Sequence, residues 1–311
     1  MDGPAPMTAS LPPLRHPVHR FRYRTIDFSR EVAVMAIVNR TPDSFWDRGA
    51  TFSLDAAVAA AEAAIRAGAA WIDVGGQPFA PGTRLTPEEE ADRVVPLVEE
   101  IRRRSDLVIS VDTFEPLVAA RCLAAGADAV NDTTGLRNPD MVAVVAEAKA
   151  SVVLTHSLAA PRTPLPRPQY DDVVSEVKAF LAGQAQRAVD GGIDEDRILL
   201  DPGHDLNKTT LHSLELTRRF AEIAALGFPT VAAVSNKDFV GETLGRPVTD
   251  RLAGSLAAAV VCILGGARVV RMHDVPAAAD AVRLTEAVLG FRAPRYLRHN
   301  LAGQGAVTLG A

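Results

Sequence analysis

From residue 32 onward, short runs rich in Val, Ile and Ala alternate with longer stretches in which apolar residues recur every three or four positions. The short runs predict buried strands, and the longer period predicts amphipathic helices. The predicted strands are 32–39, 70–76, 108–113, 129–134, 151–156, 198–203, 230–236 and 268–274. The predicted helices are 54–67, 87–104, 116–125, 139–148, 171–189, 211–226, 249–264 and 277–289.

Regular alternation of strands and helices predicts parallel strand pairing through right-handed crossovers. The strands are apolar along their length, so both faces of the sheet are covered. Eight units favour an α/β fold of the (β/α)₈ TIM-barrel type over a doubly wound sheet. We expect one domain, with an N-terminal extension over 1–30, the barrel over 31–292 and a C-terminal tail over 293–311. The extension is expected to be partly disordered, with a loose tail up to about Val18.

Composition excludes several classes of protein. The chain has 311 residues, of which 48% are hydrophobic and 23% charged, which excludes a disordered chain, a collagen and a disulfide scaffold. With 33 basic and 38 acidic residues the net charge is −5, so we expect no nucleic-acid partner. Cys122 and Cys262 lie in apolar helical segments and are expected to be buried free thiols.

No segment is expected to cross or bind a membrane. The longest strongly apolar run, about 256–267, is shorter than the roughly 18 to 20 residues that a bilayer requires. The N-terminal stretch contains Pro, His and Arg and has no continuous apolar core of the kind found in signal peptides. A cytoplasmic location is therefore expected.

Polar residues stand where the eight apolar strands end. They are Asn39, Asp73, Asp112, Asn131, Asp132, His156, Asp201, Ser235, Lys237, Arg271 and His273. In a barrel, these positions surround the C-terminal mouth, where the active sites of TIM barrels lie. A single Asp after a strand can also cap the next helix. For Asp73 and Asp132, bracing of a loop is as strong an expectation as a role in the site.

These polar residues at the strand ends fall into groups of different chemical type. Asp112, Asn131 and Asp201 are suited to the edge of a pterin or purine, because a carboxylate accepts two adjacent N–H groups. Three other side chains, those of Lys237, Arg271 and His273, are suited to a phosphate or diphosphate. Asn39 offers the kind of oxygen that Mg²⁺ accepts beside substrate phosphates.

Some of these polar residues also have a purely structural interpretation. Lys237 has the alternative of a solvated surface charge, which its place at a strand end disfavours. His156 is equally compatible with a buried hydrogen-bonded side chain and with a ligand-binding one. The pair His204 and Asp205 is interpreted as bracing a loop, because two residues without further spacing give a weak metal signal.

Seven motifs follow one another between about Val32 and Leu289. They are Asn39-Arg40-Thr41-Pro42-Asp43-Ser44-Phe45, Asp73-Val74-Gly75-Gly76, Ser110-Val111-Asp112-Thr113, Asn131-Asp132, Asp201-Pro202-Gly203, Ser235-Asn236-Lys237 and Arg271-Met272-His273-Asp274. In type, order and spacing they resemble those of dihydropteroate synthases. The resemblance implies a (β/α)₈ homodimer that joins 6-hydroxymethyl-7,8-dihydropterin diphosphate to p-aminobenzoate with Mg²⁺ and releases diphosphate.

The resemblance also implies roles for individual residues. The pterin-holding residues would be Asp112, Asn131, Asp201 and Lys237, and those holding diphosphate would be Arg271 and His273. Phe45 is counted with the substrate-binding residues. Asn39 would face Mg²⁺ and diphosphate, and the residues expected to take part in catalysis are Lys237, Asp201 and Asn39.

The chain departs from the family pattern around the second substrate. The loop that usually reads Glu-Ser-Thr-Arg-Pro-Gly is Gln77-Pro78-Phe79-Ala80-Pro81-Gly82, so its Thr and Arg are lost. Asn236 replaces another Arg, and Leu206-Asn207-Lys208 replaces Phe-Gly-Lys. This pattern resembles the divergent second synthase copy of some actinobacteria, which is reported to lack activity. Arg40 and Arg48 of the first loop are candidates to replace the lost charge.

Three hypotheses follow. The first is a dihydropteroate synthase with reduced or lost activity. The second is a paralogue that binds a pterin-like ligand without condensing p-aminobenzoate. The third, which the first-loop motif disfavours, is a methyltetrahydrofolate-type methyltransferase. The sequence leaves open whether the chain is an active enzyme.

Overall fold

Eight parallel strands form a closed barrel in the computed structural model, which describes residues 11–40, 53–82 and 84–299. They are β3 (Ala33–Asn39), β4 (Trp71–Gly75), β5 (Val108–Asp112), β6 (Ala129–Asp132), β7 (Ser151–Thr155), β8 (Ile198–Asp201), β9 (Thr230–Ala232) and β10 (Ala267–Met272). Each strand pairs with the next along the chain, and β10 closes the barrel by pairing with β3. The predicted (β/α)₈ barrel is confirmed, and the doubly wound alternative is wrong.

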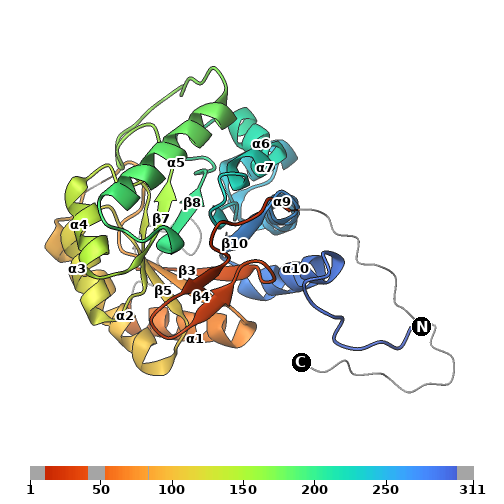
Figure 1. Cartoon of the computed structure of the whole chain (residues 1–311), viewed down its shortest axis with the longest axis horizontal. Helices are drawn as coiled ribbons and strands as arrows, with labels where there is room; N and C mark the ends of the chain where they lie inside the picture. The colour runs from red at the N-terminus through yellow and green to blue at the C-terminus, as the bar shows by residue number, and fades with distance from the viewer. Residues whose placement is uncertain (1–10, 41–52, 83, 300–311) are drawn as a thin grey trace.

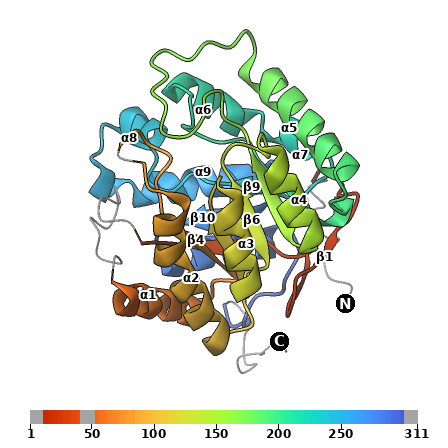
Figure 2. The same cartoon turned by 90° about the vertical axis from the view of Figure 1, so that its left-hand side faces the viewer.

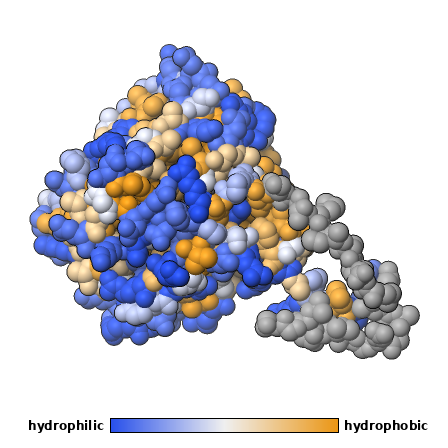
Figure 3. Space-filling model, viewed as in Figure 1, coloured by the Kyte–Doolittle hydropathy of each residue, from blue (hydrophilic) through white to orange (hydrophobic). Residues whose placement is uncertain are grey.

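Helices surround the barrel (Figure 1). They are α1 (Leu54–Ala67), α2 (Pro87–Arg104), α3 (Pro116–Ala125), α4 (Pro139–Glu147), α5 (Val173–Asp190), α6 (Thr210–Arg218), α7 (Phe220–Ala224), α8 (Asp238–Leu244), α9 (Leu252–Leu264) and α10 (Val275–Val288). Polar side chains cover much of the face in Figure 3, between smaller apolar groups, as expected for helices with one face toward solvent. Within the described residues, no helix has the length and apolarity needed to cross a membrane.

One predicted helix is divided in the structure, and one observed helix was not predicted. The expected helix over 211–226 is interrupted at Arg219, whose backbone leaves the helical region with φ −106° and ψ 25°. The short helix α8 was not predicted, because its seven residues are too few to show a helical period.

Local sequence signals explain where the helices begin and end. Ser53 accepts a hydrogen bond from Ala56 N–H at the start of α1, and Thr86 forms a capping box with Glu89 at the start of α2. Gly68 ends α1 in the left-handed region, with φ +99°. A Cβ there would strain the backbone, so the glycine fixes the turn into β4.

The strands alternate between two environments. On β4, Ile72 and Val74 pack against the helices, whereas Trp71 packs in a second cluster inside the barrel. This inner cluster takes one apolar residue from near the start of most strands, and two from β3. Its strand members are Ala33, Met35, Trp71, Val108, Ala129, Val153, Leu199, Val231 and Val269. The next inward positions along the strands are mostly polar, so the barrel interior changes from apolar to polar toward the mouth.

An antiparallel hairpin closes the other end of the barrel. Its strands are β1 (Val18–Arg20) and β2 (Thr25–Asp27), and its buried Phe21, Ile26 and Phe28 join the inner cluster. The Phe21 ring meets the Trp71 ring edge to face, with their centroids 5.1 Å apart. In Figure 2, β1 lies at the edge of the molecule away from the long segment before α5.

The hairpin was not predicted from the sequence. Of the loose tail expected up to about Val18, residues 1–10 lie outside the described residues, and Arg15 of the remainder is held by the barrel. Arg15 N–H donates to the Gly227 carbonyl at 2.9 Å, and its guanidinium pairs with Glu195. Cys122 and Cys262 are buried and free, as predicted.

Candidate active site

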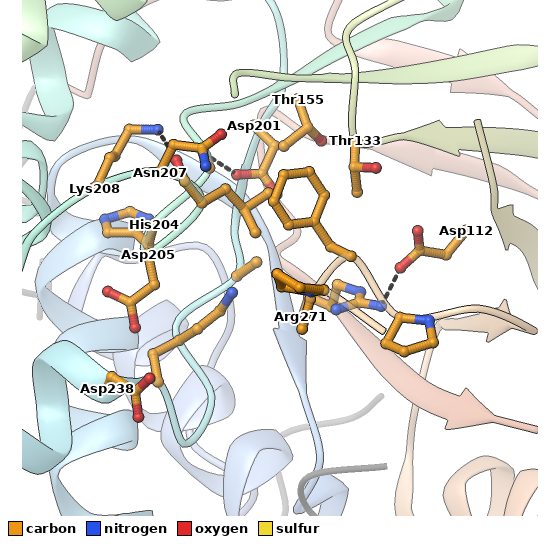
Figure 4. Close-up of a pocket in the computed structure, with 18 of the residues that line it drawn as sticks. Asp112, Thr133, Thr155, Asp201, His204, Asp205, Asn207, Lys208, Asp238 and Arg271 are labelled. Carbon is orange, nitrogen blue, oxygen red and sulfur yellow. Dashed lines mark hydrogen bonds and ion pairs between the residues drawn. The ribbon is translucent and has the colours of Figure 1, made fainter. Parts of the chain in front are cut away.

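A cavity of about 630 Å³ opens at the mouth of the barrel. Six of the predicted site residues line it, namely Asn39, Asp112, Asn131, Asp201, Lys237 and Arg271. They come from six different strands or the segments after them, so the closed barrel is what brings them together. Asp112, Asp201 and Arg271 are labelled among the lining residues in Figure 4. Phe45 and Arg48 lie outside the described residues.

Asp73 is the centre of a hydrogen-bond network below this cavity. Its carboxylate accepts bonds from Ser110 Oγ, from Asn131 Nδ2 at 3.0 Å and from Arg271 Nε at 2.7 Å. Ser110 Oγ in turn accepts a bond from Trp71 Nε1 at 2.8 Å. Asp73 therefore orients Asn131 and Arg271 from beneath, rather than capping a helix.

Arg271 bridges two carboxylates. Besides its bond to Asp73, its Nη2 lies 2.8 Å from Asp112 Oδ2, and its side chain is 16% exposed. Figure 4 shows the guanidinium directed toward Asp112. Burial raises the pKa of Asp112, and the neighbouring Asp73 and Glu90 raise it further, while Arg271 acts in the opposite direction.

Asp201 lies at the end of β8 with its side chain in the cavity. Its Oδ1 accepts a bond from Gly203 N–H at 2.7 Å. Burial raises the pKa of Asp201, against the effect of this N–H and of Lys237. Gly203 has φ +69°, and a Cβ on it would lie 2.1 Å from the His156 carbonyl oxygen. The turn after β8 thus requires glycine, and it fixes the direction of the carboxylate.

Four polar side-chain atoms of lining residues have no hydrogen-bond partner among the described residues. They are Asn131 Oδ1, Thr133 Oγ1, Thr155 Oγ1 and His204 Nδ1, and all are buried. Buried polar atoms in proteins are nearly always satisfied, so partners from a bound molecule are expected here. The two threonines were missed by the sequence analysis, because Thr is also a common strand residue.

Two lysines contribute positive charge. Burial lowers the pKa of Lys237, while the carboxylates of Asp205, Asp201 and Asp112 oppose the shift. Lys208, which was not among the predicted site residues, also lines the cavity. Its Nζ lies 2.9 Å from His156 Nδ1 and donates to the Leu206 carbonyl at 3.0 Å. Burial lowers the pKa of Lys208 to about 7.

The histidines hold structure around the cavity. His273 follows β10 and is not among the lining residues; its Nδ1 lies 2.9 Å from Ser235 Oγ. His156 contacts Lys208 and packs edge-on against Phe180. The ring of His204 stacks with those of Phe220 and Phe239. Each of these contacts fixes a loop at the mouth.

Two acidic residues brace turns, and for Asp132 this is one of the two roles that the sequence left open. The Asp132 carboxylate accepts bonds from the N–H groups of Thr134 and Leu136. Asp205 accepts from Ser213 Oγ at 2.9 Å and from Phe239 N–H. Within the described part of the chain, no group of three or more His, Cys, Asp or Glu residues is arranged to hold a metal.

Asn39 ends β3 beside Gly75 of β4, its register partner. A Cβ on Gly75 would lie 2.5 Å from Asn39 Oδ1, so the glycine makes room for the amide. The next residue, Arg40, is not in the lining; its guanidinium donates to the Arg93 carbonyl on α2.

Two segments cover the mouth. The one after β4 contributes Gln77, Pro78, Phe79, Ala80 and Pro81 to the lining, and the one after β7 contributes Thr163, Pro164, Leu165 and Pro168. Arg162 joins them, because its N–H donates to the Phe79 carbonyl at 3.0 Å and its Nη1 to the Pro78 carbonyl at 2.9 Å. The proline-rich segment was predicted as a loop, but nothing in its sequence indicated which strand's loop it would meet.

Comparison with known proteins agrees with this geometry. The family described as pterin binding enzyme matches residues 35–273. Inactive dihydropteroate synthase 2 of Mycobacterium leprae is 44% identical over 279 residues, covering 86% of this chain and 94% of that protein. Dihydropteroate synthase of Escherichia coli is 40% identical over 257 residues, covering 82% of this chain and 91% of that protein.

Solved structures of dihydropteroate synthases have a fold similar to that of this chain. The Yersinia pestis dihydropteroate synthase in complex with a sulfonamide drug has a TM-score of 0.85 at 35% identity, covering 88% of this chain and 100% of that one. A Xanthomonas albilineans dihydropteroate synthase in complex with 7,8-dihydropteroate has a TM-score of 0.79 at 38% identity, covering 88% and 98%. The chain therefore belongs to the dihydropteroate synthase family of pterin-binding enzymes.

Proposed function

We propose that the cavity binds 6-hydroxymethyl-7,8-dihydropterin diphosphate and that the chain condenses it with p-aminobenzoate slowly or not at all. The proposal that the cavity binds a pterin rests on the side chains at the inner end of the cavity. There the carboxylates of Asp112 and Asp201 accompany Asn131, whose Oδ1 lacks a partner among the described residues. Acceptors of this kind complement the adjacent N–H donors of a pterin edge.

The diphosphate would be held by cations at the same mouth. Lys237 and Arg271 line the cavity, and Arg271 is partly neutralised by its two carboxylates. Asn39 fits a role beside Mg²⁺, because a single amide oxygen suffices when substrate phosphates and water supply most ligands. When bound, Mg²⁺ would neutralise charge on the departing diphosphate.

The second half of the proposal rests on the segment after β4. Phe79 and Ala80 stand where the family pattern has Thr and Arg, and neither offers a polar side chain. Stabilisation of a leaving diphosphate depends on donors aimed at the developing charge. The Mycobacterium leprae relative that is named inactive supports the same direction.

Two measurements test the proposal. Calorimetry with the pterin diphosphate, with and without Mg²⁺, should show binding that Mg²⁺ strengthens. Incorporation of radiolabelled p-aminobenzoate should be far slower than with Escherichia coli dihydropteroate synthase, assayed alongside. Absence of pterin binding by folded protein contradicts the first half, and turnover equal to that of the reference enzyme contradicts the second.

A further inference from the structure

The two segments that cover the mouth present mostly apolar side chains to the cavity. We define the outer pocket as the lining residues that these segments contribute from Pro78 onward, namely Pro78, Phe79, Ala80, Pro81, Thr163, Pro164, Leu165 and Pro168. Within this set no side chain carries a charge, and Thr163 alone is polar. Phe79 adds an aromatic face, and the prolines restrict the backbone that carries it.

The described cations of the cavity lining have other partners or lie near carboxylates. Arg271 is bound to Asp73 and Asp112. Lys208 Nζ is bound to His156 and to the Leu206 carbonyl. Burial lowers the pKa of Lys237, and the carboxylates of Asp205, Asp201 and Asp112 oppose this shift.

Arg162, which joins the two covering segments, uses its charge on backbone oxygens. Its guanidinium donates to the carbonyls of Pro78 and Ala80. Gly82 lies against this guanidinium, since a Cβ on it would be 2.5 Å from Arg162 Nη2. The arginine therefore holds the Phe79 segment over the cavity and is not directed at a ligand.

Two carboxylates of the lining also give the cavity no attraction for an anion. Asp205 and Asp238 line the cavity, and Figure 4 shows both on the side away from Asp112. Asp238 is paired with Arg251 at 2.9 Å. Asp205 accepts bonds from Ser213 and Phe239, so neither carboxylate attracts an anion. A carboxylate bound beside the outer pocket would lose hydration among apolar side chains. A neutral ring loses little hydration and gains contact with Phe79 and Leu165.

We infer that the outer pocket selects an uncharged aromatic or apolar ring over a ring that bears a carboxylate. The second ligand of this chain is then not a benzoate but a neutral arylamine or a similar apolar group. This inference rests on the proposed function, because it takes the outer pocket as the neighbour of a bound pterin.

The test compares two probes of nearly equal shape, 4-aminobenzamide and 4-aminobenzoate. Each is titrated calorimetrically into the free protein and into protein saturated with the pterin diphosphate. We expect the neutral amide to bind at least about tenfold more tightly, which is a difference of about 1.4 kcal/mol. Equal affinity, tighter binding of the benzoate, or no binding of either probe overturns the inference.

The two protein states separate this inference from the proposed function. Failure of the pterin diphosphate to bind contradicts the proposed function, whereas the probe preference is still measured on the free protein. A benzoate preference with normal pterin binding contradicts only the inference.

Two variants locate the selectivity. Phe79→Thr should lower affinity for the amide severalfold by removing the ring face, and Arg162→Ala should do so by releasing the segment. Pterin affinity is measured for each variant alongside, and the affinity for the amide should fall by more than the affinity for the pterin. Leu158→Thr is the matched control, because Leu158 lies on the same segment as Arg162, is 36% exposed and is not in the lining. Unchanged amide affinity in both variants contradicts the role of this pocket.

Discussion

Arg271 and Asp73 form an ion pair across the inside of the barrel, with Nε 2.7 Å from Oδ2, although 198 positions separate them in the chain. The Asp73 side chain has no exposed surface. Strand β3 lies between their strands, β10 and β4, so the pair exists only once the barrel has closed. Arg271 thus supports the fold as well as facing the cavity.

This pair changes the expectation for Arg271→Ala. Sequence alone predicts loss of the preference for a diphosphate ester, with pterin affinity kept. Removing one partner of a buried ion pair costs about 3 to 5 kcal/mol, so we expect a lower free energy of unfolding and weaker binding of both the ester and the free pterin alcohol. Urea denaturation and calorimetry measure these changes.

The double variant Arg271→Ala, Asp73→Asn is the control. Because the asparagine is neutral, it should restore part of the lost stability. Unchanged stability in Arg271→Ala contradicts the structural role of the pair.

Asp201→Asn tests the pterin contact. The asparagine keeps the size of the side chain but offers one acceptor and an N–H₂ group in place of two acceptors. Loss of a buried charge-assisted contact should weaken pterin binding by more than about tenfold. Calorimetry measures the affinity, and circular dichroism checks the fold. A folded variant with full affinity contradicts the placement of the pterin.

The segment after β4 tests the loss of condensation activity. Loss of one charge-stabilising donor typically costs about 10² to 10³ in rate, so Phe79→Thr with Ala80→Arg should raise p-aminobenzoate incorporation. The backbone carbonyls that bind Arg162 are retained, so the segment should keep its position.

Ala80→Gln is the matched control, since it adds length without charge. If the Gln variant gains as much activity as the Arg variant, charge is not the missing factor. If the unmodified protein already has the rate of the reference synthase, the argument from Phe79 and Ala80 is wrong.

Glu90 on α2 predicts a pH dependence of stability. Its side chain is buried beside Gln77, and burial raises its pKa to about 7 from an ordinary value of 4.5. The folded state then holds a proton that the unfolded state releases, so stability falls as pH rises from about 4.5 to 7 and levels off above. The loss is roughly 3 kcal/mol at most, at 1.36 kcal/mol per pH unit.

Glu90→Gln should abolish this fall in stability. The free energy of unfolding of the variant should therefore decrease less between pH 5 and pH 8 than that of the unsubstituted protein. Glu88→Gln, on the exposed face of the same helix, is the comparison. Urea denaturation at the two pH values measures the difference. Equal responses of the two variants count against the buried carboxyl.

The hairpin at the other end of the barrel predicts a change of stability without a change of binding. Phe28 has no exposed surface, and Phe28→Ala should cost about 3 to 5 kcal/mol through the cavity it leaves. Pterin affinity of the folded fraction should stay the same. Tyr23→Ala on the same hairpin, where Tyr23 is 58% exposed, should cost far less. A large loss of pterin affinity in Phe28→Ala would show that the two ends are coupled.

The barrel and most of its mouth were predictable because each strand carries its own signal. Asp112, Asn131 and Asp201 stand at the ends of apolar runs, and closure of eight units brings such ends together. Pairing between side chains was not predictable, since nothing local to Arg271 indicates that it would turn inward to Asp73. The same holds for Arg162, whose partners are carbonyls of a distant segment.

The hairpin was missed for a related reason. Its strands have three residues each, too few for a periodic pattern, and its apolar residues are interleaved with arginines that indicate an exposed tail. Only the closed barrel explains why Phe21 and Phe28 are there, because they cover its end and belong to the same buried cluster as Trp71, which has no exposed surface.

The inner apolar cluster and the segments over the mouth determine different properties of this chain. Substitutions among Phe21, Phe28 and Trp71 alter how firmly the barrel holds together, whereas substitutions in the segments over the mouth alter what it recognises. A gene copy freed from its original reaction can therefore diverge at the mouth while the rest of the barrel is preserved. New ligands arise in such a lineage at little risk to folding, which makes this scaffold a favourable starting point for selecting altered specificity in the laboratory.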